Sequence, residues 1–515
     1  MQRANVFDNF PGVRGKYRQW RRQRDRACQR RKRRLSVPQI EMLEDRRMLA
    51  NWVGDIPDGT VWTSDEVQVI TADARVPAGS MLTIDPGTVV KFQAFDVDLS
   101  VEGTLNALGT GAQIIVFTSI RDDTGGDTNA DGNASSPGRG GWGRIEVTGA
   151  ATIRNAEIRY GGFSSVGQVQ VDGGTLNLSD SIIGESSTDG MRVQSSDAVL
   201  QNITYENNFN AAVSMDLNSN PDIDGVVVTD NGINGLQIDA GELQKNLSWN
   251  DPDIVYWIEG DTTVPEGVTL AIDAGQNIKF SRFDDDLLVD GTLTINGTAA
   301  DPVVITEADD DSAVGDTNNN GDSTTPGRGS WGRIELRDTS TGNTIRHADI
   351  RYGGFASIGQ LTVTNTDLTL EDSILRESSV DGLRITGTDA VLQNITYENN
   401  FDAAVSMDLN SNPDIDGVVV TDNGINGLQI DAGELQKNLS WNDPDIVYWI
   451  EGDTTVPEGI TLAIDAGQNI KFSRFDDDLF VDGTLTISGT AAAPVVITEA
   501  DDDSAVGDTN NNGDS

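Results

Sequence analysis

The sequence predicts an all-β solenoid in which short parallel strands stack along one axis. A long repeat unit occurs almost three times in the chain. Residues 201–323 and 393–515 differ at five of 123 positions, at a constant offset of 192. Within each unit, apolar–polar–apolar triplets recur every 22 or 23 residues, and this is the period-2 pattern of a short strand with one buried face. The two periods favour a coil of parallel strands over β-sandwiches, which need strands about every 8–12 residues without such a phase lock.

The triplets locate one strand of each predicted turn. In the second unit they start at Leu361, Leu383, Val405 and Leu428. A polar residue stands five positions ahead of the last three, and again in the preceding copy: Ser378, Asn400 and Asn423, with Ser186, Asn208 and Asn231 as counterparts. We expect these side chains to stack into a hydrogen-bonded ladder, because Asn at a fixed place in each turn can bond to the next and tolerates left-handed backbone. Leucine-rich repeats share this length, but their Leu-rich consensus and helical return are missing.

Further motifs resemble the right-handed parallel β-helix proteins of the pectate-lyase-like superfamily. They are VDGTLTI at 289–295, PVVIT at 302–306, WGRI at 331–334 and IRYGG at 350–354. The resemblance covers most of the chain, from about Val69, and implies a right-handed parallel β-helix built from tandem units. This order of motifs is similar to that of bacterial secreted β-helix proteins, many of which are large surface proteins without an assigned activity.

We expect four segments along the chain. They are a basic leader (1–50), a first β-helix unit (51–246), a second unit (247–438) and a truncated third unit (439–515). The third unit stops where residue 515 aligns with residue 323, before the WGRI motif and the regular turns that follow it. We therefore expect a fragment of a longer repeat protein with some tendency to associate end to end, because uncapped strand edges recruit other chains.

The leader differs in charge from the rest of the chain. It holds 15 Lys and Arg against 5 Asp and Glu, whereas the remainder holds 21 against 77. Arginine clusters bind nucleic acid where the folded surface is also positive, and here it is acidic, so we predict no nucleic-acid partner. The leader is interpreted as a disordered targeting or processing segment. No apolar run of signal-peptide or transmembrane length is present, and the single cysteine, Cys28, permits no intramolecular disulfide.

Residues 43–49 resemble the LEPR-XLL motif of planctomycete extracellular proteins. The matching residues are Leu43, Glu44, Arg46 and Leu49. Asp45 and Met48 stand where that motif has Pro and Leu. The resemblance implies export to the extracellular space or the cell surface, and it implies nothing about chemistry.

Each unit carries one acidic loop with oxygen-bearing side chains at alternate positions. The predicted metal ligands are Asp127, Asn129 and Asp131; Asp316, Asn318, Asn320 and Asp322; and Asp508, Asn510, Asn512 and Asp514. Ligands at positions 1, 3 and 5 before a glycine match the first half of a calcium loop, but position 12 is glycine where a bidentate Glu belongs, so this is no EF-hand. Two interpretations stay open: a weak calcium site of another kind, or a solvated acidic insertion.

Catalysis finds little support in the sequence. Enzymes of the superfamily act on acidic polysaccharides and need an acid–base group beside carboxylates in a groove. The one histidine, His347, has Asn155 as its counterpart and is interpreted as structural. Arg159 and Arg351, each followed by Tyr-Gly-Gly, are interpreted as packed over a neighbouring turn, with an anion-binding pair as the alternative. A groove with a basic residue within reach of two carboxylates would favour an enzyme, and the sequence offers no clear example.

The sequence thus predicts a secreted or surface-displayed repetitive β-helix protein with a structural, adhesive or glycan-binding role and no catalytic residue. Its net charge of −46 argues against an anionic polymer as ligand. The alternative is a β-helix carbohydrate-active enzyme of the polysaccharide-lyase or glycoside-hydrolase type. The expected partners are an extracellular glycan or another surface protein, and calcium is the one cofactor predicted.

Overall fold

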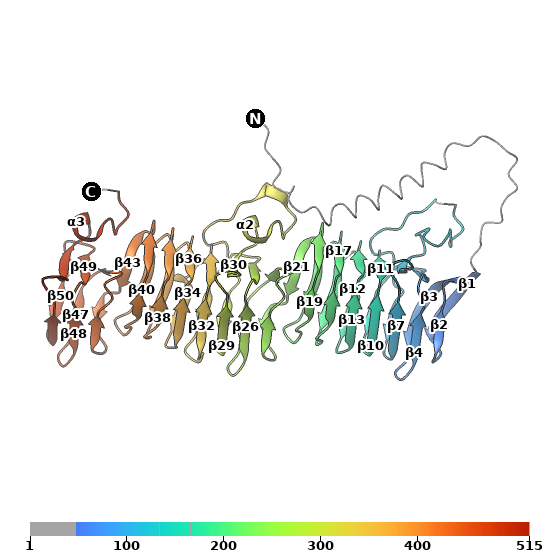
Figure 1. The fold of residues 1–515 in the computed structure, drawn as a ribbon, viewed down its shortest axis with the longest axis horizontal. Helices are drawn as coiled ribbons and strands as arrows, with labels where there is room; N and C mark the ends of the chain where they lie inside the picture. Colours follow the sequence, from blue (N-terminus) through green and yellow to red (C-terminus); the bar gives the residue numbers. More distant parts are fainter. Residues whose placement is uncertain (1–47, 133, 165–166, 514–515) are drawn as a thin grey trace, which may run out of the picture. The chain divides into compact units, whose positions relative to one another are not determined.

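Figure 1 shows the computed structural model, which describes residues 48–513 except 133 and 165–166. Residues 48–515 form one compact unit, and its strands coil into about 19 parallel turns. Strands in neighbouring turns lie about 4.8 Å apart, so the turns make a stack roughly 90 Å long. The predicted right-handed parallel β-helix is confirmed. Most of the predicted leader, with Leu43, Glu44 and Arg46, lies outside the described residues, and Leu49 lies in the first strand.

Each turn contributes up to three strands, and equivalent strands pair in register to form three rows. In the first unit, the first row contains β1 (Met48–Asp55), the start of β3 (Glu66–Val76), β5 (Val89–Phe92), β8 (Ile115–Ser119), β11 (Ala156–Arg159), β14 (Ile182–Gly184), β17 (Thr204–Glu206) and β20 (Val227–Thr229). The second row contains the end of β3, then β6 (Leu99–Val101), β9 (Ile145–Val147), β12 (Gly167–Asp172), β15 (Asp189–Gln194), β18 (Ala211–Met215) and β21 (Ile233–Ile238). The third row contains β2 (Thr60–Trp62), β4 (Met81–Ile84), β7 (Thr104–Leu108), β10 (Ala150–Arg154), β13 (Thr175–Ser179), β16 (Val199–Gln201) and β19 (Asp222–Asp224).

The second unit repeats this arrangement. Its first row contains β24 (Tyr256–Ile258), β27 (Asn277–Phe280), β30 (Val303–Glu307), β33 (Ala348–Arg351), β36 (Ile374–Arg376), β39 (Thr396–Glu398) and β42 (Val419–Thr421). Its second row contains β22 (Gly241–Glu242), β25 (Thr262–Val264), β28 (Leu287–Val289), β31 (Ile334–Leu336), β34 (Gly359–Thr364), β37 (Asp381–Thr386), β40 (Ala403–Met407) and β43 (Ile425–Ile430). Its third row contains β23 (Leu247–Trp249), β26 (Thr269–Asp273), β29 (Thr292–Asn296), β32 (Asn343–Arg346), β35 (Leu368–Glu371), β38 (Val391–Gln393) and β41 (Asp414–Asp416).

The third unit begins the same three rows again. Its strands are β46 (Val447–Ile450), β49 (Asn469–Phe472) and β52 (Val496–Glu499) in the first row; β44 (Gly433–Glu434), β47 (Thr454–Val456) and β50 (Leu479–Val481) in the second; and β45 (Leu439–Trp441), β48 (Thr461–Ile464) and β51 (Thr484–Ile487) in the third. The helical segments are single turns in the acidic loops: α2 (Asp311–Val314), η1 (Gly321–Ser323) and α3 (Asp503–Val506).

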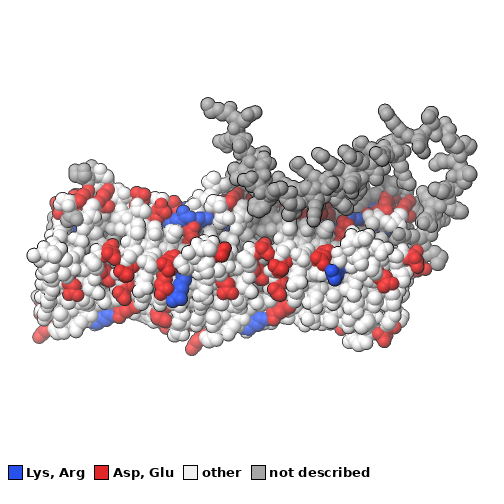
Figure 2. Space-filling model, viewed as in Figure 1, with Lys and Arg blue, Asp and Glu red and all other residues white. Residues whose placement is uncertain are grey.

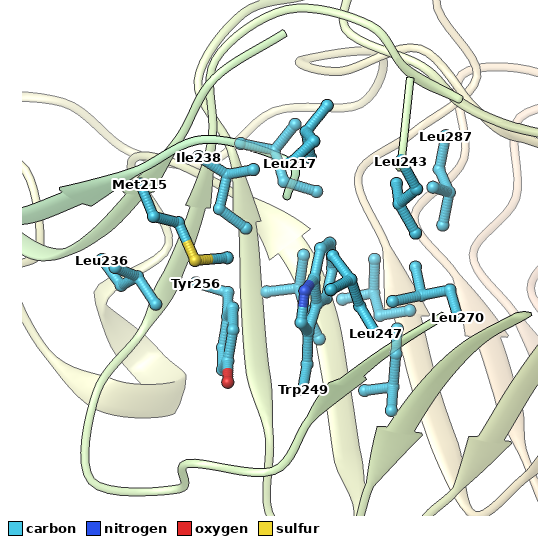
Figure 3. Close-up of a cluster of buried hydrophobic side chains, with 14 of the residues drawn as sticks. Met215, Leu217, Leu236, Ile238, Leu243, Leu247, Trp249, Tyr256, Leu270 and Leu287 are labelled. Carbon is cyan, nitrogen blue, oxygen red and sulfur yellow. The ribbon is translucent and has the colours of Figure 1, made fainter. Parts of the chain in front are cut away.

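The units share one continuous core. Strand β21 pairs with β18 of the first unit and with β24 of the second, so the sheet continues while each row shifts by one position at the boundary. Trp249 and Tyr256 stack there with ring centroids 5.1 Å apart, among the buried leucines of Figure 3. The Tyr256 hydroxyl donates to Asp251 at 2.8 Å, and Asp251 accepts the backbone N–H of Ile223 at 2.8 Å. The predicted unit boundary therefore lies inside one hydrophobic stack.

The asparagine ladder is confirmed. The Asn400 Oδ1 accepts the backbone N–H of Ser378 at 3.1 Å, and the Asn400 amide donates to Asn423 Oδ1 at 2.8 Å. The first unit carries the same ladder at Asn208. The left-handed residue is the one before each ladder position, as at Asn399 with φ 54°. The ladder thus satisfies buried backbone groups at the corner where the chain turns from the first to the second row.

The last turns expose positions that are buried in the second unit. Ile487 and Ile497 are 47% and 48% exposed, whereas their counterparts Ile295 and Ile305 are at most 1% exposed beneath the turns that follow them. End-to-end association stays a prediction.

Candidate binding groove on the second row

The predicted calcium ligands lie in the three acidic loops, and Figure 1 places α2 and α3 along one edge of the stack. In the second unit, the Asp316 carboxylate accepts the backbone N–H groups of Asn320 and Gly321 at 3.0 and 2.8 Å. The amides of Asn318 and Asn320 donate to Asp309 Oδ1 at 2.7 and 3.0 Å. The loop therefore brings Asp309, which was not among the predicted ligands, to the same oxygen cluster.

The loop of the third unit has the same contacts as the loop of the second unit, whereas the loop of the first unit has different ones. In the third unit, the amides of Asn510 and Asn512 donate to Asp501, the counterpart of Asp309, and Asp508 accepts the N–H of Asn512. In the first unit Arg121 occupies that place. There Asp127 accepts the N–H of Asp131, and Asn129 donates to Asp131. The side chain of Asp322 and all of Asp514 lie outside the described residues.

The acidic loop is also a packed structural element. The carbonyl of Thr317 accepts the backbone N–H of Asn234 at 2.7 Å, 83 residues earlier, at the end of the first unit's ladder. Lys279, fully buried, donates to the carbonyl of Gly315 at 3.1 Å, and desolvation lowers the pKa of this lysine. The third unit repeats the contact through Asn426 and Thr509. The loop of each later unit thus locks onto the unit before it.

Calcium binding by these loops stays a prediction. Among the described residues, no three Asp, Glu, His or Cys side chains are placed to hold one metal ion, so a site would need the amide oxygens of the loop. If it forms, melting temperature should rise with calcium concentration, because a ligand of the folded state stabilises it by mass action. Equal melting in chelator and in millimolar calcium would leave the acidic-insertion interpretation alone, and Asp127→Ala would then match the wild type in both conditions.

The two arginines and the histidine singled out in the sequence are structural. Arg351 is 7% exposed and pairs with Asp310 at 2.6 Å and Asp349 at 3.0 Å, where it holds the start of the acidic loop. Its guanidinium therefore has no free edge for an anion. His347 and its counterpart Asn155 both adopt left-handed backbone, with φ of 46° and 48°, so this position is a turn residue.

A different set of residues forms an open polar site along the second row. The middle residue of each second-row triplet points outward, because side chains alternate along a strand. Strand register then aligns these residues into a single line: Thr362, Arg384, Ser406 and Gln429 in the second row of the second unit, continued by Trp449 and Lys471 in the first row of the third unit. The matching line is Gln170, Arg192, Ser214 and Gln237 in the first unit, continued by Trp257 and Lys279 in the first row of the second unit. A small serine between long Arg and Gln side chains leaves a hollow in the surface.

This hollow is a groove of about 490 Å³ in the second unit. Its floor comes from the second row and the turns after it: Asp381, Arg384, Ser406, Gln429, Asp431 and Glu451. Its wall comes from the turns between the first and second rows: Ser357, Ile358, Val380, Asp402 and Ile425. Four carboxylates and one guanidinium line it, so its charge is negative.

The guanidinium of Arg384 is paired with the carboxylate of Asp431. Arg384 extends past Ser406 and forms a bidentate pair with Asp431, with Nη1 to Oδ1 at 2.8 Å. Such a planar pair satisfies both groups at once. The Arg384 Nε and the neighbouring Thr362 Oγ1 are buried and have no hydrogen-bond partner among the described residues.

Asp381 is the carboxyl of the groove whose pKa is shifted by burial. It is 5% exposed, accepts the backbone N–H of Ala403 at 2.9 Å and accepts the hydroxyl of Ser406. Burial raises the pKa of Asp381 to about 6, although the Ser406 and Ala403 hydrogen bonds and the Arg384 charge oppose this rise. Asp189 in the first unit has the same contacts and a pKa of about 6. A carboxyl that titrates near neutral pH inside a groove is a mark of a functional site.

Exposed phenylalanines stand beside the groove. Phe401 is 62% exposed and directly precedes Asp402 of the wall, while Phe355 is 40% exposed and lies two residues before Ser357. The Phe355 ring meets that of Phe283 edge to face, with centroids 4.6 Å apart. The first unit repeats these positions with Phe209, Phe163 and Phe95. Exposed aromatic residues thus adjoin the groove lining in the sequence.

A second recess, of about 560 Å³, lies between the first strands and the acidic loop of the first unit. It is lined by Leu49, Val69 and Asn129, among others. In the second unit Trp257 stands at the place of Val69, and the acidic loop contacts the preceding unit. The floor contacts of the groove recur in the first unit.

Comparisons with known proteins agree with the fold. Residues 241–359 match the family model of the pectate-lyase like beta helix domain. The chain contains a pectate-lyase-like β-helix domain. Searching the curated proteins gives no match.

Two solved structures match this chain at low similarity. The periplasmic alginate epimerase AlgG is 10% identical, with a TM-score of 0.20 over 84% of this chain and 77% of its own. The alginate lyase from Paenibacillus sp. str. FPU-7 is 11% identical, with a TM-score of 0.15 over 79% of this chain and 93% of its own. Within the described part of the chain, no helix has the length and apolar character needed to cross a membrane.

Proposed function

We propose that this chain is a secreted or cell-surface repetitive β-helix protein that binds an uncharged polysaccharide, in an adhesive or structural role. The observation that carries the proposal is the groove on the second row of the second unit, whose floor residues recur in the first unit. The resemblance of residues 43–49 to an extracellular-protein motif supports the location.

The chemistry of the groove fits sugar hydroxyls. Carboxylate, amide and hydroxyl groups of Asp381, Gln429 and Ser406 offer donors and acceptors at one surface. Sugar rings also present apolar C–H faces, and the exposed Phe401 provides an aromatic face of the kind that packs against apolar surface. A concave site with few polar groups and apolar edges is the usual form of a small-molecule subsite.

The same chemistry disfavours an anionic polymer. The only arginine of the groove lining is held by Asp431, so no free cation faces a ligand carboxylate. The other charged lining residues are acidic, and like charges repel a polyanion. Figure 2 shows acidic side chains spread over one face of the stack with few Lys and Arg among them.

A glycan array with the full chain tests the proposal. Neutral glycans should give the signal, and the double variant Phe209→Ala/Phe401→Ala should weaken binding of a short oligosaccharide about tenfold or more, which corresponds to about 1.4 kcal/mol. Phe475→Ala is the matched control, because Phe475 is fully exposed in the third unit and does not line the groove. Binding restricted to acidic glycans, or to none, would overturn the proposal.

A second candidate, a glycoside hydrolase, is favoured by one observation. Arg384 lies beside the two carboxylates Asp381 and Asp431, which is the arrangement that the sequence left unidentified. A carboxyl with a pKa of about 6 can protonate a glycosidic oxygen near neutral pH while a second carboxylate assists. Reducing-sugar release between pH 5 and 7, lost in Asp189→Asn/Asp381→Asn, would establish this activity. An array ligand that stays intact would leave binding as the function.

A further inference from the structure

We infer that Glu307 is a pH-dependent switch for the contact between the acidic loop of the second unit and the first unit. The loop stays closed on the first unit while the Glu307 carboxyl is protonated, and it opens when this carboxyl ionises. The switch is independent of glycan binding in the groove. Three features carry it: the place of Glu307 at the base of the loop, the charges around it, and the contacts of the loop with the first unit.

Glu307 lies at the base of the acidic loop, which spans residues 308–333 between β30 and β31. It is the last residue of β30 and is 4% exposed. Its Oε2 accepts the backbone N–H of Asp309 at 3.1 Å, at the start of the loop. The backbone N–H of Gly327, close to the end of the loop, also acts on this carboxylate. The carboxyl group therefore lies where the two ends of the loop come together.

The ionised form of Glu307 is poorly accommodated at this place. Its Oε1 is buried and has no hydrogen-bond partner among the described residues. The loop brings two further carboxylates, Asp309 and Asp310, close to it. Burial raises the pKa of Glu307 to about 7, and the charges of Asp309 and Asp310 add to this rise, although the hydrogen bond from the Asp309 N–H opposes it. The carboxyl therefore changes its charge near neutral pH, inside the closed loop.

The cations near Glu307 are occupied by other groups. Lys279 on β27 donates to the carbonyl of Gly315 at 3.1 Å, and Arg351 on β33 pairs with Asp310 at 2.6 Å. Four carboxylates share the charge of this lysine: Asp311, Asp310, Glu307 and Asp316. No ion pair joins either cation to Glu307 in the part of the chain that the structure describes. A negative charge on Glu307 is thus balanced only in part while the loop is closed, and opening of the loop lets water hydrate it.

The loop closes on the last residues of the first unit's asparagine ladder. The backbone N–H of Asn234 donates to the carbonyl of Thr317 at 2.7 Å, and the Asn234 amide donates to the carbonyl of Asp316 at 3.2 Å. Asn234 Oδ1 in turn accepts the backbone N–H and the amide of Asn231 at 3.0 and 3.1 Å. Opening of the loop therefore removes two hydrogen bonds from the residue that ends the ladder.

The first unit provides an internal control, because Ser119 stands where the second unit has Glu307. Its acidic loop turns in the same way: the Gly132 N–H donates to Asp127 at 2.8 Å, as the Gly321 N–H does to its own aspartate in the second unit. The base of the first loop thus carries a hydroxyl that does not ionise near neutral pH.

Hydrogen exchange of the full chain at pH 5 to 8, corrected for the intrinsic exchange rate, tests the inference. A chelator keeps cations from taking the place of the proton. The backbone amide of Asn234 is the probe. It is read in a peptide that includes Asn210, because Asp402 stands at that position in an otherwise identical stretch of the second copy.

We expect the protection of the Asn234 amide to fall as pH rises. In the open loop the carboxyl has an ordinary glutamate pKa of about 4.3, and in the closed loop its pKa is about 7. Loop opening should therefore become more frequent by on the order of 50-fold between pH 5 and pH 8. Glu307→Gln and Glu307→Ser should abolish this fall, and the Gly132 amide should not show it in any variant.

Three results would overturn the switch. Protection of Asn234 that stays constant between pH 5 and pH 8 would show that the contact does not respond to Glu307. The same fall in Glu307→Gln or Glu307→Ser would assign it to another group. An equal fall at Gly132 would show a general loosening of the acidic loops. Glu307→Ser carries the first unit's own residue at this position, so it serves as the test if Glu307→Gln does not fold.

Discussion

Replacing Trp331 with alanine is expected to remove about 3–5 kcal/mol of stability from the second unit. The indole is completely buried and stacks on Phe280 with ring centroids 4.4 Å apart. Its Nε1–H donates to the carbonyl of Arg351 at 2.8 Å. The substitution therefore leaves a large cavity and a buried carbonyl without its donor, and both effects add to the loss of buried apolar area.

Hydrogen exchange is the suitable measurement, because a solenoid is stabilised locally by each turn and its neighbours. Amides of β31 and β33 should lose protection in Trp331→Ala, while those of the first unit should keep theirs. Trp142→Ala is the matched variant: Trp142 stacks on Phe92 at 4.0 Å and donates to the carbonyl of Arg159 at 2.8 Å, so it should loosen the first unit instead. Protection that falls by less than about 1 kcal/mol near Trp331 would contradict this account.

The fold could be predicted from the sequence because each strand pairs with the equivalent strand about 22 residues later. A triplet such as Leu383-Arg-Ile385 sets which side chains are buried, and its repetition after 22 residues sets the register of the next strand. The ladder at Asn400 was predictable for the same reason, since each member bonds to the equivalent residue of the adjacent turn. Contacts between equivalent residues of adjacent turns can therefore be predicted without the rest of the chain.

The groove depends on contacts that are not periodic in this way. Arg384 reaches Asp431 across 47 residues and two turns, and only the full register shows that Ser406 lies between them. The signal was present in the triplets, whose middle residues form the outward line of the second row. The apolar positions of the triplets predict the buried core, whereas the groove is formed by the polar residues between them. The raised pKa of Asp381 arises from burial, which residue type does not reveal.

The acidic loops show a second limit of the sequence. Alternating Asp and Asn residues are compatible with a cation site, and they are equally compatible with turns whose carboxylates bind backbone N–H groups, as Asp316 does. The contact of Thr317 with Asn234 joins residues 83 positions apart and has no periodic signal. The loop therefore serves as a lock between units whether or not it also binds calcium.

Asp381→Asn is expected to stabilise the protein at pH 7 to 8 while it weakens the function of the groove. The pKa of Asp381 is raised from the ordinary value near 4 to about 6 by burial. Between these values the unfolded chain has released this proton and the folded chain still holds it, so stability falls as pH rises from about 4 to 6 and stays lower above that range. The full difference is on the order of 2–3 kcal/mol.

Asparagine cannot ionise, so the variant escapes this loss and keeps groups that can bond to Ala403 N–H and to the Ser406 hydroxyl. The free energy of unfolding of the variant minus that of the wild type should therefore increase from pH 4 to pH 7. Asp402→Asn, which changes an exposed carboxylate of the same groove, should alter stability by less than about 0.5 kcal/mol at either pH. A difference for Asp381→Asn that does not change with pH would show that this carboxyl titrates normally. A more stable variant that binds or cleaves glycans less well would show that the ionisable group is retained at the expense of stability because the groove uses it.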